Sequence, residues 1–315
     1  MKRPRARRLA IAFGALAALA CIGAIYEAVA SARDRRHPPG RLIDVGGRRL
    51  HVLCIGSGSP TVVFEPASRT RAVSFEAVRT AIARQTRVCS YDRAGTGWSD
   101  DAPASVSVGD LTEDLRRVQE NTPIQTPVVI VASSMGGWVA ELYARRFPER
   151  VGGLVLLDAG NSETLASVNA SLDRRTRLEL AAACFGIRMA RPLGVVRLLD
   201  SRPRVPGMLC AVVRGVRDTL AQFEQAPPLK ADIPLVVLSA ESADHLLPVI
   251  MPTSLQQSAA FTSLVGELRA SHRHFAARST RGSWRLVPGS GHVIAEDRPD
   301  VVVAAVAEVL RQLPR

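Results

Sequence analysis

The sequence predicts an α/β fold in which a mostly parallel central sheet carries helices on both of its faces. The first observation is a series of short, unbroken apolar runs, which are typical of strands buried on both sides. The second is that helix-like segments separate these runs, and such alternation favours parallel strands joined by helical crossovers. The strand-like runs are 49–55, 61–65, 87–91, 128–131, 153–158, 235–239 and 283–287. The helix-like segments are 73–84, 108–121, 136–147 and 300–312.

The composition indicates a folded globular protein and argues against nucleic-acid binding. The 315 residues are 47% hydrophobic and 22% charged, with 41 Lys+Arg against 29 Asp+Glu and a formal net charge of +12. Beyond the amino terminus the basic residues are scattered among acidic ones, only 4% of the residues are aromatic, and no nucleic-acid-binding motif occurs. We therefore expect no nucleic-acid partner, and the composition leaves the oligomeric state open.

The first thirty residues predict an apolar helix that is separate from the folded body. Residues 2–8 are rich in arginine, and residues 9–26 then form a run of 18 positions without a charge. A spanning helix needs about 20 apolar residues, so residues 1–30 are interpreted as a basic region plus a membrane anchor or signal segment. The positive-inside rule places the basic end in the cytoplasm and the folded body outside it. Cleavage at the small residues 28–32 would make the protein secreted, and a core helix is the third alternative.

A linker and a helical insertion divide the rest of the chain. Residues 31–40 end in His-Pro-Pro-Gly, which is typical of a linker. The α/β core comprises residues 41–160 and 231–315. Residues 161–230 show helical patterns without a strand, so we expect a helical lid over the sheet; a separate domain is the alternative, which short connections disfavour. The arginines of this lid suggest a further hypothesis, namely contact with anionic lipid headgroups.

The cysteines and histidines do not form a recognisable metal or redox site. No two of the five cysteines have Cys-x-x-Cys spacing, so neither a zinc site nor a thioredoxin-like site is expected. Cys54 and Cys89 lie in strand-like runs and are expected to be buried small hydrophobes. If the body is exported, one disulfide such as Cys184–Cys210 is an option. The histidines His272 and His274 lack a third ligand, and no nucleotide or flavin motif occurs, so we expect no metal and no cofactor.

Residues 128–137 have the pattern of a serine held on a sharp turn between a strand and a helix. A buried strand leads into a run of small residues, and a helix-like segment follows. Such a nucleophile elbow needs small residues two positions before and after the serine, which for Ser134 are Ala132 and Gly136. The turn lifts the Ser134 hydroxyl above the sheet and points the Met135 amide to where an oxyanion would form. Ser133 is the neighbouring candidate, with less suitable spacing.

His292 is the candidate base for this serine. It follows a strand-like run and a Pro-Gly-Ser-Gly turn, and it precedes the carboxy-terminal helix. A loop histidine in this place can reach a serine at the carboxyl edge of the sheet, where α/β proteins build their sites. Its imidazole can remove the serine proton at neutral pH.

Four stretches together resemble the α/β-hydrolase fold family. The segment Ala-Ser-Ser-Met-Gly-Gly at 132–137 resembles the family's nucleophile turn, and 91–100 resembles its strand-4 loop. Residues 289–292 resemble the turn with its catalytic histidine, and 40–47 resemble the entry to its first strand. The stretches come in the family's order over residues 41–315. The resemblance implies an α/β-hydrolase fold with a serine nucleophile.

The acid and the second oxyanion donor are less well defined than the serine and the histidine. Asp158 directly follows a strand, a position that some family members use, whereas Asp244 lies in the more common loop. Glu241 competes with Asp244, because the segment Ala-Glu-Ser-Ala-Asp is one residue longer than usual. By position, the second oxyanion amide is that of Ser68, although the family often has a glycine in this loop.

Asp92 and Arg93 belong to the strand-4 loop and are expected to serve the structure of that loop. We expect a charge-assisted lock between these two side chains and the neighbouring backbone rather than a part in catalysis. The glycines Gly95 and Gly97 allow the chain to return tightly after them.

The predicted function is a serine hydrolase that cleaves an ester or a similar small acyl substrate through an acyl-enzyme. The predicted partners are the small-molecule acyl substrate and a membrane reached through the amino-terminal helix. The alternative is a non-catalytic, membrane-tethered binding protein with the same fold, because a fold does not fix a reaction.

Overall fold

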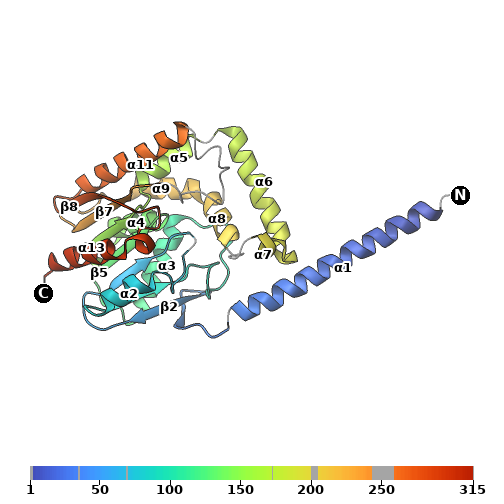
Figure 1. The fold of residues 1–315 in the computed structure, drawn as a ribbon, viewed down its shortest axis with the longest axis horizontal. Helices are drawn as coiled ribbons and strands as arrows, with labels where there is room; N and C mark the ends of the chain where they lie inside the picture. Colours follow the sequence, from blue (N-terminus) through green and yellow to red (C-terminus); the bar gives the residue numbers. More distant parts are fainter. Residues whose placement is uncertain are drawn as a thin grey trace.

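The structure is a computed structural model and describes residues 3–34, 36–68, 70–171, 173–199, 205–242 and 259–314. Its centre is an eight-stranded sheet with the order β1-β2-β4-β3-β5-β6-β7-β8 (Figure 1). The pairs β1–β2 and β2–β4 are antiparallel, and every other neighbouring pair is parallel. The strands are β1 Arg41–Asp44, β2 Arg49–Ile55, β3 Val62–Glu65, β4 Val88–Tyr91, β5 Val128–Ser133, β6 Val151–Leu157, β7 Leu235–Ala240 and β8 Gly282–Val287. The predicted mostly parallel sheet is confirmed, and each predicted strand recurs with ends that differ by at most two residues.

Helices cover both faces of the sheet. One face packs against α2 (Glu76–Ala83) and α13 (Pro299–Arg311), and the other against α3 (Val108–Glu120), α4 (Gly136–Arg146) and α11 (Ala259–Ala277). Strand β5 shows why the strands read as unbroken apolar runs. Ile130 belongs to the core under α3 and α4, whereas Val129 and Val131 belong to the core under α2 and α13. Successive side chains of a strand point to opposite faces, so a strand between two helical layers is apolar at every position.

The chain between β6 and β7 is helical. It comprises α5 Ser162–Ser171, α6 Arg174–Ala190, η2 Arg191–Leu193, α7 Val195–Leu199, α8 Val205–Arg214 and α9 Val216–Gln225. No strand occurs in the described residues of 161–230, which we call the helical insertion. A disulfide between Cys184 of α6 and Cys210 of α8 ties two of its helices together.

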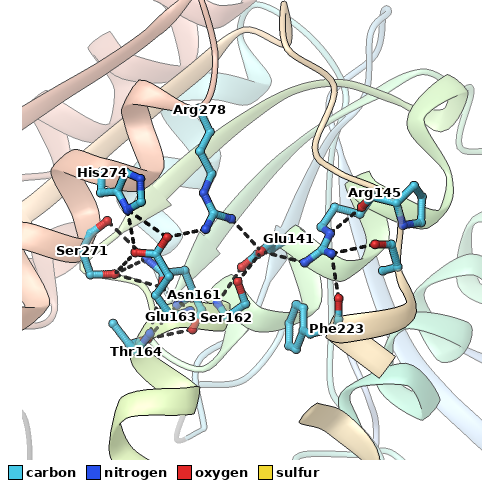
Figure 2. A network of polar contacts seen from close by, with 12 residues as sticks. Glu141, Arg145, Asn161, Ser162, Glu163, Thr164, Phe223, Ser271, His274 and Arg278 are labelled. Atoms are coloured by element: carbon cyan, nitrogen blue, oxygen red, sulfur yellow. Dashed lines mark hydrogen bonds and ion pairs between the residues drawn. The ribbon is translucent and has the colours of Figure 1, made fainter. Parts of the chain in front are cut away.

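Both ends of the helical insertion are fastened to the core by a buried polar network around Glu141 of α4 (Figure 2). The Glu141 carboxylate accepts hydrogen bonds from the Ser162 amide and hydroxyl, both at 2.7 Å, where α5 begins. Arg145, one turn along α4, donates to the Phe223 and Ala226 carbonyls at the end of α9. These contacts hold the insertion on the core at its entrance and its exit.

Cys54 and Cys89 form a disulfide, which corrects the expectation that both are isolated buried hydrophobes. Cys54 on β2 and Cys89 on β4 are paired in the antiparallel register, with Cα atoms 4.1 Å apart. Their side chains therefore point to the same face of the sheet and meet. The sequence hides this proximity, because the two strands are neighbours in the sheet but are separated along the chain by β3 and α2.

The amino terminus forms the predicted apolar helix. Helix α1 (Arg3–Asp34) projects from the body (Figure 1), and its segment Ile11–Asp34 is long and apolar enough to cross a membrane by length and composition. Only 6% of its most apolar window is buried, whereas a core helix would be mostly buried. The helix continues to Asp34, so the first residues of the predicted linker are helical. Two short helices complete the fold: η1 (Pro148–Arg150) precedes β6, and α12 (Ile294–Asp297) precedes α13.

Candidate active site

Ser134 lies on a strained turn between β5 and α4. Strand β5 ends at Ser133, α4 begins at Gly136, and the φ angle of Ser134 is +52°. A non-glycine residue in this left-handed region costs about 1–3 kcal/mol and persists only where neighbouring contacts impose it. Here the Ser134 amide donates to the Leu157 carbonyl at 3.3 Å, and the Ser134 carbonyl accepts from Gly160 at 2.9 Å. The backbone of the β6 end thus fixes the turn.

The glycines Gly136 and Gly137 are required because backbone atoms of other segments lie very close to them. A Cβ atom on Gly136 would lie 2.7 Å from the Glu65 carbonyl oxygen, and one on Gly137 would lie 2.1 Å from the Gly160 carbonyl oxygen. Real Cβ atoms essentially never approach a backbone atom so closely. The start of α4 is therefore pressed between the end of β3 and the loop after β6, so both of these segments lie beside the turn of Ser134.

Exposure distinguishes Ser134 from its neighbour. Ser133 ends β5 and is 6% exposed, whereas Ser134 is half-buried. Met135, the residue before the first residue of α4, is 6% exposed and has helical backbone angles. Its N–H belongs to the amino-terminal end of α4, where the helix dipole is positive and the first backbone amides, which lack an acceptor within the helix, favour an anion. The turn therefore combines a serine that is only partly buried with an environment suited to negative charge.

Asp158 and His292 are hydrogen-bonded to each other. His292 Nδ1 lies 2.7 Å from Asp158 Oδ2, and the two side chains are 12% and 4% exposed. A carboxylate can only accept, so Nδ1 of His292 donates to it, and in the neutral ring this leaves the lone pair on Nε2. Asp158 Oδ1 accepts from the Ala240 amide at 3.1 Å, which directs the carboxylate toward His292. This pairing holds the imidazole in the tautomer that a general base needs.

The backbone at the end of β6 positions Asp158. Its amide donates to the Leu238 carbonyl of β7 at 2.7 Å, and its φ angle is +43°. The residue thus turns off the strand while its backbone is still tied to the neighbouring strand. Two of the positive-φ residues of the chain, Ser134 and Asp158, follow adjacent parallel strands, and strained backbone of this kind gathers at functional sites.

The loop that carries His292 is braced by other carboxylates. The amide of Gly289 donates to Glu241 Oε2 at 2.8 Å, and the amide of Gly291 donates to Asp297 Oδ2 at 2.8 Å. Asp297 ends the short helix α12 (Ile294–Asp297), which follows His292. Glu241 therefore holds the histidine loop by its backbone, while the acid bonded to the ring is Asp158. Asp244 lies outside the described residues.

A second histidine, His272 of α11, lies behind Asp158, and its proximity to this carboxylate was not predicted from the sequence. Its Nδ1 is 3.9 Å from Asp158 Oδ1. Its Nε2 lies 2.9 Å from the Ala159 carbonyl, which can only accept, so Nε2 carries the proton. Its Nδ1 then accepts from the Ser239 hydroxyl at 2.7 Å. Burial is the main cause that lowers the pKa of His272, which favours the neutral form of the ring beside Asp158.

The strand-4 loop forms a structural lock under the site, as the sequence predicts for Asp92. The Asp92 carboxylate accepts from the amides of Ala72 at 2.7 Å and Trp98 at 3.0 Å, and from His51 Nδ1 at 2.9 Å. A Cβ atom on Gly97 would lie 2.1 Å from Asp92 Oδ2, which explains the glycine there. The Asp92 carboxylate is thus fully used in shaping its own loop.

Arg93 pairs with the buried Glu65 at the end of β3 instead of with Asp92. Arg93 Nε donates to Glu65 Oε1 at 3.0 Å, and the Tyr91 hydroxyl donates to Glu65 Oε2. Burial raises the pKa of Tyr91 well above its ordinary value, so the phenol stays protonated and remains a donor. This network fixes the end of β3, against which Gly136 packs.

Ser68 lies in the loop after β3, as the sequence predicts, and is half-buried. Pro66, Thr70 and Arg71 of this loop, with Ser133 and Leu157, line a small cavity of about 10 Å³ next to the turn of Ser134. That is room for about one water molecule and far less than an acyl substrate needs. In the part of the chain that the structure describes, no group of three or more His, Cys, Asp or Glu residues could hold a metal ion.

The family of the chain follows from its match to a family model. The model described as the alpha/beta hydrolase family matches residues 52–305, which is most of the chain. The protein therefore belongs to the alpha/beta hydrolase family, as the resemblance of its four motifs suggested. Family membership supports a hydrolase.

The curated relatives add sequence similarity without assigning a substrate. An uncharacterized protein of Schizosaccharomyces pombe is 25% identical over 312 residues, which cover 86% of this chain and 56% of the relative. A cis-3-alkyl-4-alkyloxetan-2-one decarboxylase of Shewanella oneidensis is 26% identical over 118 residues, which cover 36% of each chain. The chain thus spans little more than half the length of the S. pombe relative and less of the other.

Solved structures share the fold at low sequence identity. An esterase from Thermogutta terrifontis has a TM-score of 0.58 at 19% identity and covers 86% of this chain and 97% of its own. The enol-lactonase from Burkholderia xenovorans LB400 has a TM-score of 0.57 at 18% identity, with 86% and 100% covered. A laboratory-evolved variant of potato epoxide hydrolase has a TM-score of 0.60 at 16% identity, with 87% and 98% covered. Such identities show the fold alone.

Proposed function

We propose that the protein is a serine hydrolase in which Ser134 is the nucleophile, His292 the general base and Asp158 the acid that orients the base. The observation that carries the proposal is the 2.7 Å hydrogen bond between His292 Nδ1 and Asp158 Oδ2. Ser134 supports it, because a left-handed serine between β5 and α4 is the backbone form of a nucleophile elbow. A serine at this position disfavours chemistry that needs an aspartate nucleophile.

Each group has one step in the reaction. The Ser134 oxygen attacks the substrate carbonyl carbon while its proton passes to His292 Nε2, and Asp158 stabilises the imidazolium. The carbonyl oxygen becomes an oxyanion, which accepts from the Met135 amide and, by position, from the Ser68 amide. The tetrahedral adduct then expels the alcohol, which takes the proton from His292. Water repeats the same sequence on the acyl-enzyme, so that the acid is released and Ser134 recovers its proton.

The proposed substrate is an ester or a similar small acyl compound. We infer that the helical insertion acts as a lid, since it lies between β6 and β7 and its first helix begins four residues after Asp158. We also propose that α1 anchors the protein in a membrane with the body outside the cytoplasm. Two disulfides, Cys54–Cys89 and Cys184–Cys210, support this location because disulfides persist in oxidising compartments.

A second candidate function is a non-catalytic, membrane-tethered binding protein. The loop Pro66-Ala67-Ser68 favours it, because the residues after β3 lack the glycine that often provides the second oxyanion amide in the family. The two candidates differ in one measurable property, which is turnover at Ser134.

The test is hydrolysis of p-nitrophenyl esters of increasing chain length by the full chain in detergent. We expect turnover by the wild type, and a loss of at least about 10³-fold in Ser134→Ala. Ser133→Ala is the matched control, since it removes a neighbouring hydroxyl that is buried. No turnover by well-folded wild type across the series would favour the binding protein, and equal activity in Ser134→Ala would exclude Ser134 as the nucleophile.

A further inference from the structure

The apolar helix α1 does not leave the body freely but contacts the helical insertion. A Cβ atom on Gly23 would lie 2.2 Å from the Leu193 carbonyl oxygen, so the backbones of α1 and η2 touch. One on Gly194 would lie 3.1 Å from the Gly23 carbonyl oxygen and 3.1 Å from Tyr26 Cδ1. Figure 1 shows α7 beside the carboxyl-terminal part of α1, with α6 and α7 at the side of the body from which α1 projects.

One turn after Gly23, helix α1 is joined to α7 by a group of ion pairs and hydrogen bonds around Arg197, which we call the polar clamp. Arg197 of α7 donates to both oxygens of Glu27, at 2.8 and 3.0 Å, and to Asp34 Oδ2 at 2.7 Å. Ser31 donates to Glu27 Oε1 at 2.7 Å and accepts from Arg197 at 3.1 Å. Glu27 is 8% exposed and the Arg197 side chain is 12% exposed. An ion pair shielded to this degree fixes the direction of α1 relative to the insertion.

The clamp sets the depth at which the insertion meets a membrane crossed by α1. The charge-free run ends at Tyr26, and Glu27 begins the polar part of the helix. Gly23 lies three residues inside that run, which is about 5 Å along a helix that rises 1.5 Å per residue. Since Gly23 touches Leu193, η2 reaches about the depth at which interfacial helices bury their apolar faces, 5–10 Å. The membrane surface therefore coincides with this edge of the body.

Exposed apolar side chains gather on the same elements. Leu178, Phe185 and Met189 of α6 are 62%, 65% and 58% exposed, and their spacing of seven and four residues places them on one face of the helix. Leu193 of η2 and Val195 and Leu198 of α7 follow in the chain and are 40%, 41% and 76% exposed. A row of this kind is unusual on a surface that meets only water. Exposed arginines such as Arg174, Arg175 and Arg188 flank it, as in helices that lie at a lipid headgroup layer.

We propose that these six apolar residues form a membrane-contact edge that dips into the lipid interface beside α1, with Arg197 as the clamp that holds it there. The proposal rests on the proposed anchoring by α1 and does not depend on the proposed hydrolase activity. The occupant is the lipid interface, because the edge is continuous with the anchor and lies at the level where its apolar run ends. The protein is then held at the membrane by two contacts with a fixed orientation, and not by a flexible tether.

The test measures lipid contact at single positions in the full-length protein in nanodiscs. Cys21→Ser removes the free cysteine, and an NBD fluorophore is placed on Leu198→Cys, Leu16→Cys or Leu286→Cys. Leu16 reports the anchor, and Leu286 is the control, an exposed leucine of strand β8. Quenching by nitroxide-labelled phospholipids is then compared. We expect strong quenching at position 16, and quenching at position 198 at least about threefold stronger than at position 286.

A second comparison tests the clamp. Arg197→Ala is expected to lower quenching at position 198 at least about twofold while quenching at position 16 is unchanged. Arg217→Ala is the control, because it removes an exposed arginine of α9. If position 16 is quenched but position 198 is quenched no more than the control position 286, the membrane-contact edge is overturned and only the anchor remains. A label at position 198 that is blue-shifted but not quenched by the lipids would show that a protein surface, and not lipid, covers the edge, which would also overturn it. Absence of quenching at position 16 would overturn the anchor and the edge together.

Discussion

Asp158 and His292 stand 134 positions apart in the chain, yet the Nδ1 of His292 lies 2.7 Å from Oδ2 of Asp158. The contact arises because β6 and β8 flank β7 in a parallel arrangement, so that the loops after both strands emerge at the same edge. Ser134 follows β5 at that edge, and its backbone is bonded to Gly160 in the loop of Asp158. The sheet order thus assembles the proposed site from three loops.

The first prediction concerns the acid. Asp158→Asn should lower kcat for a p-nitrophenyl ester by about 10³- to 10⁴-fold, because an amide cannot hold the histidine in the tautomer that accepts the serine proton. The fold should be retained, as monitored by circular dichroism. Glu241→Gln is the control, since the Glu241 carboxylate accepts a hydrogen bond from the Gly289 amide and not from the His292 ring. A larger loss in Asp244→Asn than in Asp158→Asn would place the acid after β7 instead.

The second prediction concerns the packing of the elbow. Gly137→Ala should lower the free energy of unfolding by at least about 2 kcal/mol, because its Cβ would meet the Gly160 carbonyl oxygen at 2.1 Å. Gly186→Ala is the matched control, a helical glycine with open space where the Cβ would lie. It should be neutral or stabilising by up to about 1 kcal/mol. Denaturant titrations in detergent compare the two, and equal stability would contradict the close approach.

The third prediction concerns pH. Burial lowers the pKa of His272 below its ordinary value of about 6.5, so the unfolded chain binds a proton near pH 6 that the folded protein does not. Stability from this group is fully present above pH 6.5 and is lost as the pH falls toward the lower folded value, with a limiting slope of about 1.4 kcal/mol per pH unit.

The measurement is the free energy of unfolding between pH 7.5 and about 5. His272→Gln should flatten the fall below pH 6.5, whereas His274→Gln, whose side chain is 68% exposed, should leave it unchanged. Equal pH dependence in wild type and His272→Gln would mean that His272 is not held neutral by its surroundings.

The fourth prediction concerns the helical insertion. Cys184→Ser combined with Cys210→Ser should destabilise the protein by about 2–4 kcal/mol, because the disulfide closes a loop between α6 and α8. Thermal unfolding should show a lower Tm, whereas Cys21→Ser, at an exposed and unpaired position, should leave the Tm unchanged. An identical Tm in the double variant would contradict a native Cys184–Cys210 bond.

Local patterns were sufficient to predict seven of the eight strands, the strand–turn–helix pattern around Ser134 and the apolar helix. Val128–Ser133 reads as a buried strand because helices cover both of its faces, and the small residues after it follow from the approach of Glu65 and Gly160. These features can be predicted because the neighbours of each segment restrict the residue types that the segment itself can carry. The same patterns did not predict helix α11, which carries His272.

Contacts between distant segments could not be predicted in this way. The Cys54–Cys89 bond depends on the register of two strands, and the Glu27–Arg197 clamp joins residues 170 positions apart. Nothing in either local sequence marks its partner. The choice between Asp158 and Asp244 was open for the same reason, since it depends on which loop reaches His292.

Covalent labelling shows whether position 134 carries a reactive serine. The full chain is treated with a fluorophosphonate, which modifies serines activated by a neighbouring base, and the modified peptide is located by mass spectrometry. We expect one adduct, on Ser134, and a rate of labelling that falls at least about 10³-fold in His292→Ala. Well-folded protein that stays unmodified, or an adduct on another serine, would contradict it.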